Sequence, residues 1–319
     1  MKHWKECCTI GITTRDRVED LRHTIEKQEA IGLGDLHYII VDDGSANADG
    51  LRRVAAQLPR CRFVRHEYSA GLIQRRNEMA AMCETEFLIS LDDDSYFVDL
   101  TGMEKAIAAM TGDPQIGLVS FKIIQLYIDP QRFERRTTQY PPGKTMFFRG
   151  CGYVVRVKTF LTHGGFPAEL RHGCEESHLQ YRFFAAGTKI LHVPAVVVEH
   201  RWTWGGRPSG EREFLLYRSQ PMLKLINEPL LVALAGCIKL LFWNSWHGRG
   251  PFRTQFRGIC SGIRAGMQLR GRWLPLTVKQ YFVFRREWRS CFKPEAVEAG
   301  ATGQTLAAFG YCPNAVARK

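Results

Sequence analysis

Residues 71–94 read GLIQRRNEMAAMCETEFLISLDDD, and this stretch decides the fold that we expect. The first part, 71–83, is typical of a helix that follows a glycine, and the second part, 86–94, is a short apolar run typical of a buried strand. A helix that leads directly into a buried strand is the repeating unit of a parallel α/β sheet. The run ends at three adjacent aspartates whose carboxylates repel one another, so this strand end needs a cation, a strong hydrogen-bonding partner or solvent.

The same alternation of strand and helix extends over the first part of the chain. We expect strands at 8–14, 37–45, 62–67 and 86–94, and helices at 18–32, 50–58 and 71–83. This order predicts an α/β fold with a mostly parallel, Rossmann-like sheet that carries helices on both faces. In such sheets, ligands bind beyond the carboxyl ends of the strands.

Polar side chains lie at these carboxyl ends, in three clusters that are distant in the sequence. They are Thr13, Thr14 and Arg15; Asp42 and Asp43; and Asp92, Asp93 and Asp94. Mg²⁺ typically takes one or two carboxylates together with substrate phosphates, so two acidic strand ends predict a metal and phosphate site. The alternatives are a solvated acidic turn for the aspartates and a helix N-cap region for the threonines.

Further candidates lie on helices. Arg75, Arg76 and Asn77 follow Gly71, and arginine suits the recognition of phosphates and planar bases. A solvated helical face would have the same composition, so both interpretations stay open for this group.

Two glutamates and a histidine in the later sequence could carry chemistry. Glu175 and Glu176 begin the expected helix 174–187, where they are either general-base candidates or simple stabilisers of the first helical turn. His200 follows the apolar run of the expected strand 189–202 and could be a metal ligand or a structural residue.

The charge of the 319-residue chain is unevenly distributed. The net charge is +12, but residues 201–293 contain 17 Lys and Arg against 4 Asp and Glu. Such asymmetry indicates an anionic partner for the later third, which could be a membrane surface, a nucleic acid or an acidic substrate. The ten cysteines are scattered without CxxC or zinc spacing, and the start of the chain lacks the apolar run of a signal peptide. We therefore expect reduced thiols in a cytoplasmic protein.

The later sequence has a different organisation. One or two strands are expected over 116–128 and a polar loop over 129–144, and the apolar stretch 229–243 is too short for a typical membrane span. We interpret this stretch as a buried or interfacial helix, and basic residues interleaved with tryptophans around it fit an anionic membrane surface. The expected units are 1–118, 119–205 and 206–319, the last a basic, mainly helical extension.

Taken in order, these segments resemble the inverting family 2 glycosyltransferases with the GT-A fold, over roughly residues 7–205. The matching segments are GITTRDRVEDLRHTIEKQ, IIVDDGS, GLIQRRNEMAAMCETEFLISLDDDS with its DxD motif, GGF at 164–166, CEESHLQYRFFAAGTKI and VVVEH. The chain departs from the family pattern in two places. Glu176 stands where an aspartate is usual, and His178 replaces a second aspartate.

The resemblance implies roles for the expected units and for the candidate residues. Residues 1–118 would be the nucleotide-sugar-binding half of the GT-A domain, and 119–205 would be its acceptor-binding and catalytic half. The nucleotide-sugar site would comprise Thr13, Thr14, Arg15, Asp42, Asp43, Gly71, Arg75, Arg76, Asn77, Asp92 and Asp93. Asp94 and His200 would hold Mg²⁺ or Mn²⁺, and Glu176 would be the catalytic base with Glu175 as its rival. Gly150, Gly164 and Gly165 would shape the acceptor pocket.

The function implied by the resemblance is metal-dependent, inverting transfer of a hexosyl or deoxyhexosyl group from a nucleotide-diphosphate sugar to an acceptor hydroxyl. The acceptor would be a glycan or a lipid-linked molecule in cell-surface glycan or polysaccharide synthesis. The protein would be cytoplasmic or peripheral on the inner face of the cytoplasmic membrane. The alternatives are a nucleotidyltransferase, which usually has a Gly-rich phosphate loop near its N-terminus, and a basic nucleic-acid-binding protein. No RNA- or DNA-binding motif occurs, so we expect no nucleic-acid partner.

Overall fold

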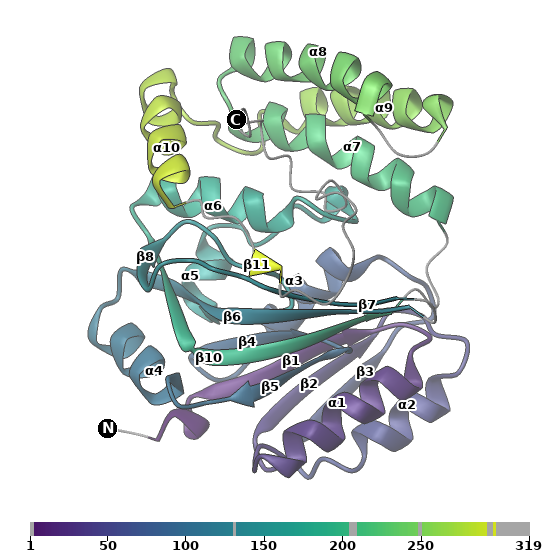
Figure 1. Cartoon of the computed structure of the whole chain (residues 1–319), viewed down its shortest axis with the longest axis vertical. Helices are drawn as coiled ribbons and strands as arrows, with labels where there is room; N and C mark the ends of the chain where they lie inside the picture. The colour runs from purple at the N-terminus through teal and green to yellow at the C-terminus, as the bar shows by residue number, and fades with distance from the viewer. Residues whose placement is uncertain (1–2, 130–131, 204–208, 248–250, 292–295, 298–319) are drawn as a thin grey trace.

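The computed structural model describes residues 3–129, 132–203, 209–247, 251–291 and 296–297 (Figure 1). The helices are α1 (Val18–Ala30), α2 (Ala48–Ala55), α3 (Leu72–Met82), α4 (Met103–Gly112), α5 (Val157–Thr162), α6 (Glu175–Ala186), α7 (Ser209–Asn227), α8 (Leu230–His247), α9 (Phe252–Leu269) and α10 (Val278–Cys291), with short 3₁₀ helices at Trp4–Glu6 and Ala168–Leu170. The strands are β1 (Cys8–Thr14), β2 (His37–Asp42), β3 (Cys61–Arg65), β4 (Phe87–Asp92), β5 (Ser95–Asp99), β6 (Ile116–Asp129), β7 (Arg132–Thr137), β8 (Gly143–Thr145), β9 (Gly152–Arg156), β10 (Lys189–Thr203) and β11 (Ala296–Val297).

The first part of the sheet is parallel, as the sequence predicts. The strands lie in the order β3, β2, β1, β4, and each neighbouring pair runs in the same direction. Thr13 of β1 lies opposite Val41 of β2 and Asp92 of β4, so the carboxyl ends of the three strands meet at one edge. The α/β fold is therefore confirmed, and the polar clusters are brought together at that edge.

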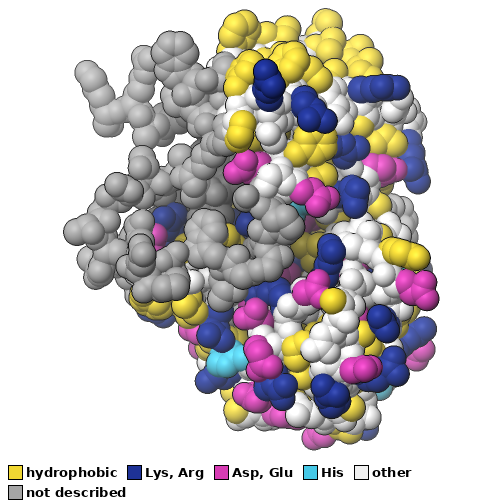
Figure 2. All heavy atoms as spheres, turned by 90° about the vertical axis from the view of Figure 1, so that its right-hand side faces the viewer, with side chains coloured by type: hydrophobic (Ala, Val, Ile, Leu, Met, Phe, Trp, Pro, Cys, Tyr) yellow, Lys and Arg dark blue, Asp and Glu magenta, His cyan; other side chains and the backbone are white. Residues whose placement is uncertain are grey.

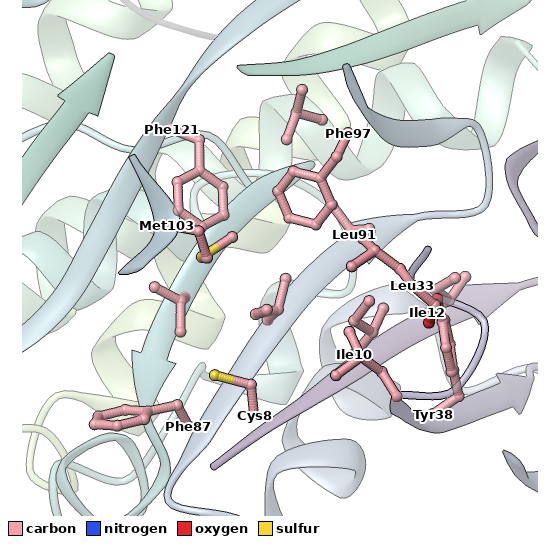
Figure 3. Packing of buried hydrophobic residues seen from close by; sticks show 14 of the residues in the cluster. Cys8, Ile10, Ile12, Leu33, Tyr38, Phe87, Leu91, Phe97, Met103 and Phe121 are labelled. Atoms are coloured by element: carbon pink, nitrogen blue, oxygen red, sulfur yellow. The ribbon is translucent and has the colours of Figure 1, made fainter. Parts of the chain in front are cut away.

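Alternating side chains of each strand pack against helices on the two faces of the sheet. Ile10, Ile12 and Ile40 lie in a core cluster with residues of α1, α2 and α4, whereas Ile39 and Val41 lie in a second cluster with residues of α3, α5 and α6. Figure 3 shows the first cluster from close by. This two-residue period follows from strand geometry, which directs successive side chains to opposite faces.

Beyond β4 the sheet is mixed, which is a small difference from the mostly parallel sheet expected. β9 runs antiparallel to both β4 and β6, and β10 runs parallel to β6 but antiparallel to β5 and β8. β6 is one strand through Ile116–Asp129 and crosses the expected boundary between 118 and 119. The expected boundary at 205 lies outside the described residues.

The polar segment 129–144, expected to be a loop, contains two strands. β7 pairs antiparallel with β6, and β8 pairs with β10. The charged composition of β7 resembles that of a loop in the sequence, but Glu134 and Arg136 have local partners. Arg136 forms an ion pair with Glu134 and lies 5.2 Å from the centre of the Tyr127 ring.

The helices α7 to α10 form a layer above α6, on the side of the sheet away from α1 and α2 (Figure 1). Close packing joins α9 to α7, because α9 presents glycines there. A Cβ atom added to Gly262 would lie 2.0 Å from the carbonyl oxygen of Arg218, and one on Gly258 would lie 2.8 Å from the Cβ of Tyr217. Among the described residues, none of the helices has both the length and the apolar character needed to cross a membrane.

Candidate active site

Two aspartates and a histidine gather at the carboxyl ends of the central strands. β10 pairs antiparallel with β5 so that His200 lies opposite Ser95, directly after the three aspartates. The imidazole Nε2 of His200 lies 3.0 Å from a carboxylate oxygen of Asp94 and 3.8 Å from one of Asp92. One ligand atom from each of these residues lies within 4.8 Å of the others. Two carboxylates and an imidazole are a donor set that fits a divalent cation such as Mg²⁺ or Mn²⁺.

Arg17, a residue that the sequence analysis missed, neutralises the aspartate cluster from the other side. Its guanidinium donates to Asp93 at 2.8 Å, to Asp94 at 2.7 Å and to Asp20 at 2.8 Å. Burial alone would raise the pKa of the Asp94 carboxyl, but His200 and Arg17 together hold it well below its usual value. Asp94 is therefore an ionised carboxylate, as a metal ligand must be.

Asp93 has a different environment from its two neighbours. Its side chain is buried and accepts a hydrogen bond from the Thr14 hydroxyl at 2.8 Å, while its backbone carbonyl accepts one from Thr24 at 2.8 Å. Burial raises the pKa of Asp93 to about 8, although Arg17 acts in the opposite direction. These contacts hold the strand end in place, so the three aspartates are not equivalent.

Arg76 links the aspartate cluster to the two glutamates of α6. Its buried guanidinium donates to Asp92 at 2.6 Å, to Glu175 at 3.0 Å and to the carbonyl of Gly150 at 2.9 Å. Glu175 is buried, and its burial and the neighbouring Glu176 raise its pKa to about 8 while Arg76 opposes them. The sequence-distant clusters therefore meet around one arginine.

Glu176 lies at the same place but is less buried than Glu175. Its carboxylate accepts a hydrogen bond from the backbone N–H of Gly150 at 3.1 Å. A Cβ atom added to Gly150 would lie 2.7 Å from Nη1 of Arg76 and 2.9 Å from Oε1 of Glu176. The absence of a side chain at Gly150 is thus required for these groups to approach one another.

Asp43 and Arg75 organise the loop before α3. The Asp43 carboxylate accepts hydrogen bonds from Ser69 Oγ, from the backbone N–H groups of Ala70 and Gly71, and from Arg75 Nε, at 2.6, 2.8, 2.9 and 2.7 Å. Burial opposes ionisation, but these donors lower the pKa of Asp43 below its usual value. Four protein donors already occupy this carboxylate, so its visible role is to shape the loop.

The remaining residues predicted for the nucleotide lie around this loop. Asp42 is buried and accepts the N–H of Ser45 at 2.9 Å, and Thr13 is buried on β1. Arg15 is exposed and lies 3.7 Å from the carboxylate of Asp16.

Asn77 and the predicted acceptor glycines form a separate contact. The Asn77 amide donates to the carbonyl of Phe166 at 2.7 Å and accepts from its N–H at 2.9 Å. Gly164 and Gly165 both have positive φ, at 82° and 64°, and a Cβ atom on Gly164 would lie 3.1 Å from the ring of Trp273. These three residues therefore build a turn that contacts the C-terminal extension.

His178, at the second departure from the family pattern, is packed inside the protein. Its ring is buried and meets Trp273 edge-on, with the ring centres 4.5 Å apart. Burial lowers the pKa of His178 to about 3, so the ring is neutral at physiological pH. If an aspartate stood here, as in the family pattern, its ionised carboxylate would be buried in place of this neutral ring.

Comparisons with known proteins agree with this architecture. The family model described as glycosyl transferase family 2 matches residues 9–164. Pre-mycofactocin glycosyltransferases from two strains of Mycobacterium tuberculosis are 26% identical over 208 residues, which is 60% of this chain. The chain spans 42% of the length of these curated relatives.

Solved structures share the fold at low sequence identity. GalNAc-T7 with UDP, GalNAc and Mn²⁺ matches with a TM-score of 0.57 and 16% identity, covering 83% of this chain and 56% of that one. The mannosyltransferase PcManGT from Pyrobaculum calidifontis, in complex with GDP-Man and Mn²⁺, matches at 0.52 and 15%, covering 83% and 86%. S. aureus TarS in complex with UDP-GlcNAc matches at 0.54 and 13%, covering 89% and 88%. These matches show that the chain has the GT-A fold.

Proposed function

Because residues 9–164 match the model of glycosyl transferase family 2, we propose that the protein transfers a sugar from a nucleotide-diphosphate sugar to an acceptor hydroxyl. The observation that carries the proposal is the convergence of two acidic groups, Asp92 and Glu175, on Arg76 beside a candidate cation site. A cation can neutralise the diphosphate leaving group of a nucleotide-sugar, and a nearby carboxylate can take the proton of the acceptor hydroxyl. The family match does not favour the alternative of a nucleotidyltransferase.

Asp94 and His200 would hold the divalent cation, and Asp92 would be its third protein ligand or a contact to the ribose. Support for this set comes from the short distances between its donor atoms and from the ionised state of Asp94. A bound Mg²⁺ or Mn²⁺ would neutralise the charge that develops on the diphosphate leaving group. Two of the structural neighbours were solved with Mn²⁺, which supports the same class of ion here.

Glu176 would act as the general base of an inverting reaction. It would take the proton from the acceptor hydroxyl while the acceptor oxygen bonds to the anomeric carbon and the bond to the diphosphate oxygen breaks. Glu175 is buried and engaged by Arg76, whereas Glu176 is partly accessible and oriented by the N–H of Gly150. This difference favours Glu176 as the base and Glu175 as a residue that positions Arg76.

Arg75, the loop at Gly71 and the strand ends at Thr13, Thr14, Arg15, Asp42 and Asp43 would surround the nucleotide. The donor would be a nucleotide-diphosphate sugar that delivers a hexosyl or deoxyhexosyl group, and the acceptor would be a glycan or a lipid-linked molecule. Neighbours in complex with GDP-Man and UDP-GlcNAc support the class of donor, with either a purine or a pyrimidine base.

A screen of nucleotide-diphosphate sugars tests the proposal. Each donor is added to the full chain with Mn²⁺ and with EDTA, and both thermal unfolding and release of the nucleotide diphosphate are measured. We expect at least one donor to raise the unfolding temperature in the presence of Mn²⁺ alone and to be slowly hydrolysed. If no donor stabilises the chain, whereas nucleoside triphosphates do so with release of pyrophosphate, the proposal is wrong and the nucleotidyltransferase is right.

A further inference from the structure

One surface of the C-terminal layer combines exposed apolar side chains with basic ones. On α8, Leu231, Leu234 and Ile238 are 81%, 36% and 57% exposed, and on α9, Phe252 and Phe256 are 59% and 48% exposed. We call this surface the α8–α9 face, and its exposed basic residues are Lys239, Arg253, Arg257 and Arg264.

The helical period explains why these residues share one surface. On α8, Leu231, Leu234 and Ile238 follow one another at intervals of three and four positions, and therefore form one stripe. The opposite stripe, with Ala233 and Cys237, is buried in a cluster with Leu225 of α7.

The orientation of α9 is fixed in the same way. Gly258, Gly262 and Gly266 face α7, and a Cβ atom on any of them would lie less than 3.0 Å from an atom of that helix. Arg253, Arg257 and Arg264 lie on the opposite stripe and are exposed. Figure 2 shows hydrophobic side chains gathered at the top of the molecule, where α8 and α9 lie, with Lys and Arg side chains close to them.

Within the segment of the chain that contains α8 and α9, the charge has one sign. Residues 229–286 contain ten Lys and Arg and no Asp or Glu. An apolar stripe flanked by arginines on neighbouring helices is the composition of helices that lie in the interface of an anionic bilayer.

We propose that the α8–α9 face docks on the surface of an anionic lipid bilayer. The stripe of α8 and the two phenylalanines of α9 would enter the boundary between headgroups and acyl chains, and the arginines of α9 would contact the phosphates. Since none of the described helices can cross a membrane, the helices would lie along the surface. This inference is independent of the proposed enzymatic function, because it rests on residues outside the family match.

Two other occupants fit the face less well. In a symmetric pair of chains the face would meet its own copy, and arginines of one copy would lie against arginines of the other. A single-stranded nucleic acid would use the basic residues but stacks its bases on aromatic rings, whereas the most exposed residue of the α8 stripe is a leucine. A bilayer uses both the aliphatic and the basic side chains.

Vesicle flotation with the full chain tests the proposal. The two probes are vesicles of phosphatidylcholine alone and vesicles that also contain phosphatidylglycerol. We expect the chain to float with the second kind and much less with the first. Increasing NaCl should weaken the binding, because salt screens the contacts between arginines and headgroups.

Two sets of variants separate the two components of the face. The charge variant R253Q/R257Q/R264Q should bind anionic vesicles on the order of a hundredfold more weakly, since each basic residue near the membrane surface contributes roughly fivefold. Its matched control is K27Q/R52Q/R53Q, which removes the same charge from exposed positions on α1 and α2 and should float like the wild type. The apolar variant L231S/L234S/I238S should also lose binding, whereas its control I31S/V98S/L161S should not.

Four results would overturn the proposal. They are equal flotation with neutral and anionic vesicles, no flotation at all, flotation of the charge variant at the wild-type level, and equal losses in the controls. The face would be assigned to a second copy of the chain by three results together. The wild type would be dimeric by light scattering, the apolar variant would be monomeric, and the wild type would not bind vesicles. Displacement of the chain from vesicles by single-stranded RNA, with tighter RNA binding than lipid binding, would assign it to a nucleic acid. Circular dichroism and the unfolding temperature confirm that each variant is folded.

Discussion

The edge of the sheet and the α8–α9 face are both highly charged, but their charges are arranged in opposite ways. At the sheet edge, buried acidic groups have basic partners at hydrogen-bond distance, such as Arg17 for Asp94 and Arg76 for Glu175. Around the α8–α9 face, the sequence supplies ten basic residues over 229–286 and no acidic one. The paired charges of the first region therefore fix the positions of its side chains. The exposed charges of the second region produce a positive electrostatic potential at the surface.

This difference predicts how each region responds to change. A buried ion pair that loses one partner leaves a desolvated charge, so substitutions at the sheet edge should be costly. An exposed charge is already solvated, so substitutions on the α8–α9 face should leave stability nearly unchanged. The following experiments test the contrast, beginning with the largest expected effect.

Removal of the proposed base should have the largest effect. We expect Glu176→Gln to lower the rate of sugar transfer by about a thousandfold, since general bases contribute about 10² to 10⁴ in rate. Asp94→Ala should abolish transfer to a similar degree, but only this variant should also lose Mn²⁺-dependent nucleotide binding, measured by calorimetry. Glu26→Gln, on the exposed side of α1, serves as the control. Transfer by Glu176→Gln at the wild-type rate would contradict the assignment of the base.

Removal of the arginine at the centre of the site should affect folding itself. Arg76→Met leaves Glu175 buried without its cation, and the free energy of unfolding should fall by about 3–5 kcal/mol. The double variant Arg76→Met with Glu175→Leu should recover part of this loss, because the unpaired carboxyl is removed. Urea denaturation measures both.

An arginine-to-methionine substitution on the α8–α9 face provides the comparison between the two regions. Arg257→Met should change the free energy of unfolding by less than about 0.5 kcal/mol. Equal losses in the free energy of unfolding for Arg76→Met and Arg257→Met would show that burial of the charge does not distinguish the two regions.

The packing between α7 and α9 gives an intermediate effect. Gly262→Ala places a Cβ atom 2.0 Å from the backbone carbonyl oxygen of Arg218, so the helices must move apart. We expect a loss of about 1–3 kcal/mol in the free energy of unfolding. Gly271→Ala is the matched control, because no atom lies within 4 Å of its added Cβ. A loss in the control as large as that in Gly262→Ala would exclude steric contact as the cause.

A smaller effect than that of Gly262→Ala concerns pH and the buried His178. Its pKa is lowered to about 3 in the folded protein, from 6.5, so the folded state binds fewer protons than the unfolded chain in acid. Its contribution to stability is complete above pH 6.5 and is lost as the pH falls, by about 1 kcal/mol between pH 7 and pH 5.5. His178→Leu should remove this part of the pH dependence, measured as the difference between the two urea titrations. Parallel titrations of wild type and variant would contradict it.

The sequence could predict the elements whose burial pattern is local. The strand at 8–14 has the predicted bounds, and α6 ends at Ala186 with Gly187, which has a φ of 71°, as its C-cap. The aspartate clusters were placed at the correct edge because parallel strands share their carboxyl ends.

Other features depend on contacts that no local pattern contains. Arg17 is 76 residues from Asp93, and Asn77 is 89 residues from Phe166, with which it exchanges two hydrogen bonds. The sequence did not predict β7 because its polarity is typical of a loop, whereas Glu134 and Arg136 pair with each other within the sheet. The two faces of α8 differ in exposure because α7 covers one of them, and the sequence of α8 alone does not contain this contact.

The glycine stripe of α9 has a consequence for how this protein can change over many generations. Gly258, Gly262 and Gly266 let the backbone of α9 approach α7 closely, and the exposed arginines on its outer side face away from that contact. Substitutions at these arginines should therefore accumulate with little penalty to the fold, whereas larger residues in place of the glycines would force the helices apart. The affinity of the proposed membrane surface can therefore change, or be engineered, without changes at the sheet edge.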